Sequence, residues 1–131
     1  MYTKNKIIPN ALPSRLQYRA RLIDNIAINE FDRLETLSVR DGYQFIPIPE
    51  VFDNTKVVQI QLVVDAIGIG TFDWSVTIGT NVETGTFPSN AVDQITDVSY
   101  VVNTSDKIFI NITAISGVQP TGLTLVVTIV E

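Results

Sequence analysis

The feature that most constrains the fold is a two-residue alternation of apolar and polar side chains in the second half of the chain. Between residues 71 and 78 the apolar side chains are Phe72, Trp74, Val76 and Ile78, and threonine, aspartate and serine residues stand between them. Such a period places the two sets of side chains on opposite faces of a β-strand. The run therefore predicts a strand with one face on a core, and Trp74 as its largest core residue.

Related patterns recur through residues 57–131 and predict further short strands. We expect these at 57–65, 98–102, 108–113 and 123–129, separated by turns rich in glycine, proline, asparagine and aspartate, with a turn also at 80–85. Short strands with turns at this spacing indicate an all-β, antiparallel sandwich rather than alternating strands and helices. The last two strands should add six side chains to the core: Ile108, Ile110, Ile112, Leu123, Leu125 and Val127.

The first part of the chain follows neither the strand period nor the helix period well. Residues 1–56 hold eight basic and seven acidic residues, whereas 57–131 hold one basic and seven acidic ones. We therefore place a boundary near residues 53–56, between an N-terminal arm with an irregular segment (1–56) and a sandwich body (57–131). Asn29 could cap a short helix over 30–37. Residues 45–49 should form an extended edge segment, because their two prolines lack ladder donors.

Residues 1–15, together with the nearby Arg19 and Arg21, resemble a binding arm more than part of a monomeric core. Two prolines keep residues 1–15 out of regular helix interiors. A sparse set of arginines could contact nucleic acid, but Leu16, Tyr18 and Leu22 interrupt it, so we expect it to pair with an acidic protein surface. The net charge of −5 also argues against a broad nucleic-acid footprint. The side chains that we expect to bind a partner are Ile7, Ile8, Leu12, Arg15, Arg19 and Arg21.

The absence of cysteine and histidine limits the chemistry that the chain can perform. It excludes a Ser-His-Asp triad, a cysteine nucleophile and metal sites built on either residue. Carboxylate chemistry stays open, but we expect no enzyme activity, no cofactor and no bound metal. Five aspartates could form an oxygen-ligated calcium site: Asp65, Asp73, Asp93, Asp97 and Asp106. We expect them instead to be solvated carboxylates in turns and at strand edges. No apolar stretch approaches 18 residues, so we expect no membrane span.

Two aromatic residues could serve as stacking platforms for a sugar. Trp74 shares its strand face with Phe72 and Val76, and Tyr100 shares its face with Val98 and Val102. These apolar neighbours favour core positions for both rings.

Three stretches carry a resemblance to a known family. Residues 72–80 read F-D-W-S-V-T-I-G-T, residues 105–112 read S-D-K-I-F-I-N-I, and residues 120–129 read P-T-G-L-T-L-V-V-T-I. Together they make the stretch from Gln61 to Glu131 resemble the small β-sandwich, often jelly-roll, domains of tailed-bacteriophage virion proteins. Ser105 stands where the family usually has glycine, and the family's usual Asn-Gly hairpin is absent at 65–70.

The resemblance implies a jelly-roll-like sandwich and a structural role in the virion. Its members include capsid decoration or cement proteins and tail-fibre domains. The decoration role implies a place on the outer capsid surface, with the major capsid protein and neighbouring copies of the chain as partners, in a trimer or a dimer. A fibre or receptor-binding tip is the alternative, although no shaft repeat precedes the body. A carbohydrate-binding module is the second alternative.

Overall fold

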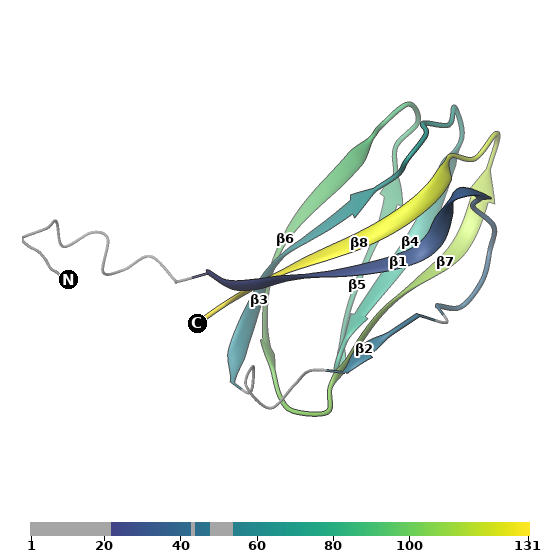
Figure 1. Cartoon of the computed structure of the whole chain (residues 1–131). Helices are drawn as coiled ribbons and strands as arrows, with labels where there is room; N and C mark the ends of the chain where they lie inside the picture. The colour runs from purple at the N-terminus through teal and green to yellow at the C-terminus, as the bar shows by residue number, and fades with distance from the viewer. Residues whose placement is uncertain (1–21, 43, 48–53) are drawn as a thin grey trace, which may run out of the picture.

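Two antiparallel sheets, packed face to face, form the described part of the protein (Figure 1). The computed structural model describes residues 22–42, 44–47 and 54–131. Within these ranges the chain forms strands, turns and irregular loops and contains no helix. The predicted all-β sandwich is therefore confirmed.

Each sheet has four strands. The first has the order β1-β8-β3-β6 and the second the order β2-β7-β4-β5. The strands are β1 (Leu22–Thr36), β2 (Ile46–Pro47), β3 (Thr55–Val63), β4 (Thr71–Ile78), β5 (Asn81–Phe87), β6 (Asp93–Val102), β7 (Lys107–Ser116) and β8 (Thr121–Val130).

The strand order is that of a jelly roll. The first strand pairs with the last, the second with the seventh, the third with the sixth and the fourth with the fifth, always antiparallel. The chain thus behaves as one long hairpin that is rolled up, so that successive strand pairs fall in opposite sheets. Pairing of β8 with β3 and of β7 with β4 completes each sheet. This wrapping is the double-sheet jelly-roll architecture.

Alternate side chains of both sheets meet in a single core. All ten side chains expected there from the strand pattern are buried. The rings of Phe72 and Phe87 stack with their centroids 4.8 Å apart. From the first part of the chain, β1 adds Ile26, Ile28 and Phe31, each at most 8% exposed. The core is therefore built from both halves of the sequence.

The expected helix over residues 30–37 is wrong, because β1 continues as a strand to Thr36 and pairs with β8. Three register shifts interrupt that pairing, at 22–24, 29–31 and 31–36. Each shift displaces the alternation of side chains between the two faces. The sequence consequently lost its period of two in this strand, and a helix appeared to fit equally well.

The expected boundary near residues 53–56 also needs correction. Strands β1 and β2 precede it, yet they pair with β8 and β7, which follow it. Residues 22–42 and 44–47 therefore belong to the sandwich and not to an arm. The expected edge segment contains β2, which is an edge strand, while residues 48 and 49 lie outside the described part. The arm residues before Leu22 lie outside it too.

The expected turn at 80–85 is also wrong. The turn comprises Gly79 and Thr80, and β5 follows at once. Gly79 has a φ of 66°, which favours glycine at this tight turn. The inward side chains of β5 include Glu83 and Gly85, so the strand lacks the apolar alternation that marks its neighbours.

We predict that Trp74→Ala lowers the free energy of unfolding by about 3–5 kcal/mol, the usual cost of deleting a large buried aromatic. Trp74 is 2% exposed, so its removal leaves a cavity between the sheets. Urea unfolding of the variant measures the loss. Phe45→Ala is the control, since Phe45 is 52% exposed and its removal should cost much less. Unchanged stability of the Trp74 variant would contradict the core assignment.

Candidate functional site

The connection from β1 to β2 closes one side of the sandwich. It leaves the first sheet after Thr36 and runs along the outer edge of β7 in the second sheet. Arg40 and Ile112 exchange backbone hydrogen bonds of 3.1 and 3.0 Å, and the Gly42 N–H donates to Asn111 Oδ1 at 2.7 Å. A Cβ on Gly42 would lie 2.2 Å from the Ile110 carbonyl oxygen, so this close approach requires glycine.

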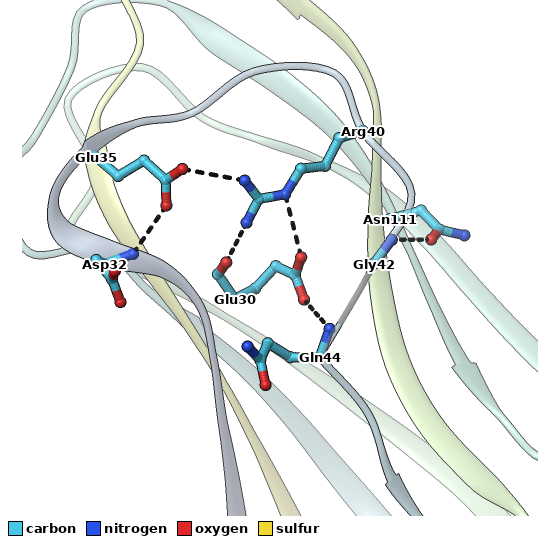
Figure 2. A network of polar contacts seen from close by, with 7 residues as sticks. All are labelled: Glu30, Asp32, Glu35, Arg40, Gly42, Gln44 and Asn111. Atoms are coloured by element: carbon cyan, nitrogen blue, oxygen red, sulfur yellow. Dashed lines mark hydrogen bonds and ion pairs between the residues drawn. The ribbon is translucent and has the colours of Figure 1, made fainter.

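A polar network fastens the same connection to β1 (Figure 2). The Arg40 guanidinium donates to Glu30 through Nε at 3.3 Å and to Glu35 through a terminal nitrogen at 3.1 Å. Its other terminal nitrogen donates to the Glu30 carbonyl oxygen. The second carboxylate oxygen of Glu30 accepts the Gln44 N–H at 3.3 Å. The guanidinium also lies 3.7 Å from the ring centroid of Phe31.

The network has the character of a structural clamp. Glu30 is 1% exposed, and its charge is balanced by Arg40 beside it. Both carboxylate oxygens of Glu30 and all three guanidinium nitrogens of Arg40 already have partners. These atoms therefore hold the loop in place and offer no free group for chemistry. Sequence reasoning missed this pair because its members lie ten residues apart, on a strand and a loop.

We predict that Arg40→Ala destabilises the protein by about 3–5 kcal/mol, because it leaves the buried Glu30 carboxylate without its balancing charge. The double variant Glu30→Leu/Arg40→Leu should recover most of that loss, since an apolar pair of similar volume often replaces a buried ion pair at little cost. Urea unfolding of the two variants and the wild type gives the comparison. A double variant no more stable than Arg40→Ala would contradict this account.

The opposite side of the sandwich, between β5 and β6, is closed by polar side chains. Trp74 Nε1 donates to Gln94 Oε1 at 2.9 Å, and Gln94 Nε2 donates to the Thr86 carbonyl at 3.0 Å. The Tyr100 hydroxyl donates to Glu83 Oε1 at 2.5 Å. Trp74 is thus a buried residue tied to the edge strands. Tyr100 is half-buried and holds β6 to β5.

We predict that Tyr100 ionises above its ordinary pKa of about 10. The hydrogen bond to Glu83, then burial, then the charge of that carboxylate raise the pKa of Tyr100. Because the folded pKa exceeds the unfolded one, the stabilisation is complete below about pH 10 and is lost as the pH rises through the folded value. Ultraviolet difference titration should show a lower pKa in Glu83→Gln, with Tyr100→Phe identifying the signal. An unchanged titration in Glu83→Gln would contradict the contact.

The five aspartates considered as calcium ligands do not come together. Among the residues that the structure describes, no three acidic side chains form a group that could hold a metal ion. Several of the aspartates have local partners instead: Asp73 accepts from Thr86 Oγ1 at 2.7 Å, Asp93 from Gln61 Nε2 at 3.0 Å and Asp106 from the Asn103 N–H at 3.0 Å. The six expected partner-binding residues of the arm lie outside the described residues.

The most distinctive surface is one end of the sandwich, which we call the loop tip. It consists of loops 64–70, 88–92 and 117–120, at the upper right of Figure 1. The Gly70 N–H donates to the Val118 carbonyl at 2.7 Å, and the Asn90 N–H donates to the Gly68 carbonyl at 2.9 Å. The Ser89 hydroxyl donates to the Ile69 carbonyl at 2.6 Å. Hydrogen bonds therefore join the three loops into one framework.

Two glycines make this framework possible. A Cβ on Gly68 would lie 2.4 Å from the Pro120 nitrogen, and one on Gly70 would lie 2.3 Å from the Ser116 carbonyl oxygen. The backbone of loop 64–70 therefore lies directly on the chain at 116–120, an approach that any larger residue would prevent. Ile67 and Ile69, which alternate with these glycines, are 54% and 68% exposed.

Exposed apolar side chains concentrate at the loop tip and the strand ends beside it. Of the eleven large apolar side chains exposed among the described residues, seven lie at this end: Leu34, Val39, Ile67, Ile69, Val92, Ile115 and Val118. Single exposed apolar residues are common on soluble proteins, whereas a concentration of them marks interaction surfaces. We therefore take the loop tip as the candidate binding surface. The sequence did not point to this surface, because the glycine-containing stretch 66–70 indicated only a turn.

The loop tip is also acidic. Its three loops contain Asp65 and no basic residue, and strands β4 and β6 beside them add Asp73 and Asp93. Residues 32–41 at the same end add two arginines and three acidic residues, a net charge of −1. The surface therefore suits a partner that combines apolar and basic groups.

Comparisons with known proteins identify no relative: no family model, curated protein or solved structure matches the chain. The described residues contain no helix that is long and apolar enough to cross a membrane.

Proposed function

We propose that the chain is a virion structural protein, a capsid decoration or cement protein that binds the outer surface of the shell and stabilises it. In this role it acts by binding and not by catalysis, with the major capsid protein and neighbouring copies as partners. The jelly-roll topology supports the proposal, since this architecture is common in viral capsid proteins. The topology alone does not define a function, because the same fold occurs in lectins and cupins.

The observation that carries the proposal is a separation of charge along the chain. Residues 1–21 contain five basic residues and no acidic one, whereas residues 22–131 contain four basic and fourteen acidic residues. A basic segment that also holds Ile7, Ile8 and Leu12 is suited to an acidic protein surface with apolar pockets. An acidic body repels bulk nucleic acid. This combination fits a protein that lies on a shell and extends a segment across its neighbours.

A carbohydrate-binding module is the second candidate, favoured by one depression on the outer face of the β2-β7-β4-β5 sheet. The depression has a volume of about 300 Å³. It is lined by hydroxyl groups and a carboxylate, the kinds of group that bind sugar hydroxyls, from Asp73, Ser75, Thr84, Thr86 and Thr113. Because Trp74 faces the core, the depression offers no exposed aromatic face for stacking. A glycan on this surface would therefore depend on hydrogen bonds.

We predict that the full chain binds expanded shells that lack it, taken from the virus whose genome encodes it, and raises their melting temperature. Deleting residues 1–15 should weaken that binding at least tenfold, about 1.4 kcal/mol. The eight strands of the described residues begin after this segment, so the body should melt at nearly the same temperature. Co-sedimentation with shells measures binding, and calorimetry measures shell and body stability.

Two outcomes would contradict the decoration proposal. A full chain that leaves the shells unbound removes the proposed partner. Equal binding by the full chain and the deletion variant removes the role of the arm. Binding to a glycan array that is lost in Thr84→Val/Thr86→Val, without any binding to shells, would favour the carbohydrate-binding alternative.

A further inference from the structure

We propose that residues 1–15 of one copy dock on the loop tip of a neighbouring copy. The inference deepens the proposed function, on which it rests, by assigning the surface through which decorating copies would link to one another. The loop tip is the receiving surface, and the partner is a segment of this same chain that combines apolar and basic side chains.

The loop tip is prepared for such a partner before it binds. Three loops are joined by the hydrogen bonds from Gly70, Asn90 and Ser89. A fourth bond, from the Leu37 N–H to the Pro120 carbonyl at 3.1 Å, ties the β1–β2 connection to the same framework. A surface held in this way loses little conformational freedom on association, so its exposed isoleucines contribute to affinity at low entropic cost.

The chemistry of the N-terminal segment matches that of the loop tip. The tip exposes Ile67, Ile69, Val92 and Val118, and its loops carry a negative charge without any basic residue. The segment offers Ile7, Ile8 and Leu12 to the apolar side chains, and Lys4, Lys6 and Arg15 to the carboxylates. Its lack of acidic residues means that no charge in it opposes the surface.

The direction of β1 favours a neighbouring copy over the chain's own body. Leu22 pairs with Val130, at the end where the C-terminus lies, whereas Thr36 pairs with Thr121 beside the loop tip (Figure 1). The two ends of β8 are about 30 Å apart at the usual rise of a strand. A segment that precedes Leu22 would have to reverse and run this whole distance to reach its own tip. It reaches the tip of a copy stacked end to end without any reversal.

The test uses two variants that lack complementary halves of the contact. One lacks residues 1–15 and keeps the tip; the other carries Ile67→Asp/Ile69→Asp and keeps the segment. Both isoleucines are more than half exposed, so the substitutions leave the core intact. Sedimentation equilibrium from about 10 μM to about 1 mM covers contacts as weak as a millimolar dissociation constant. No capsid shells are present.

We expect the full chain to associate with rising concentration and each variant to associate at least about tenfold more weakly. A mixture of the two variants should form a one-to-one complex, because one supplies the segment and the other the tip. Val82→Asp is the matched control: Val82 is 56% exposed but lies on β5, next to the turn at the opposite end, and this variant should associate like the full chain.

A full chain that stays monomeric would overturn the inference, and so would a mixture of the variants that forms no complex. A monomeric full chain is also the result expected if the segment docks on the tip of its own chain. Failure of the inference and failure of the proposed function can be told apart. Shell binding by a chain that is monomeric in solution removes the inference and leaves the function. Association of copies that do not bind shells does the reverse.

Discussion

Burial of β8 between its neighbours supports the remainder of the structure. This strand pairs with β1 on one side and β3 on the other, and Leu123, Leu125, Val127 and Ile129 along it are completely buried. The chain has no cysteine, so no disulfide contributes to its stability. The apolar contact between the two sheets must therefore offset most of the conformational entropy of folding. The clamp of Arg40 and Glu30 and the polar contacts of Tyr100 close the sides of this core.

The strands that could be predicted are those whose inner faces lie deep between the sheets. Strand β4 alternates through all eight residues and was predicted with its observed bounds, and the predicted strands at 57–65, 98–102, 108–113 and 123–129 overlap β3, β6, β7 and β8. Strands β1 and β5 were not predicted, and each has a physical reason for lacking a clear alternation. Register shifts interrupt β1. Strand β5 lies at a sheet edge, where Glu83 accepts a hydrogen bond from Tyr100 of β6 and Gly85 lies against the Trp74 ring, so no apolar alternation was required there.

The candidate binding surface was harder to foresee than the fold. Its apolar side chains belong to segments that are up to 84 residues apart, from Leu34 to Val118, and each segment alone reads as an ordinary turn or strand end. Only the rolled hairpin brings the segments to one end of the molecule. The arm, in contrast, was inferred from local sequence alone, from the prolines and the apolar and basic side chains of residues 1–15, and it stays a prediction. A local property of the sequence could be read directly, whereas a surface made by topology could not.

The same topology restricts how copies of the chain could assemble. The eight strands alternate in direction, so the start of β1 and the end of β8 lie together at one end of the sandwich. The connections after β1, β3, β5 and β7 lie at the other end. The start of β1 and the loop tip therefore lie at opposite ends of the body. A contact between the segment of one copy and the tip of another joins unlike surfaces, so the pair keeps one free segment and one free tip. Such a contact either closes into a ring or continues as a chain, and the angle between successive bodies decides which. For a protein proposed to cover a shell, the curvature of the shell would set that angle.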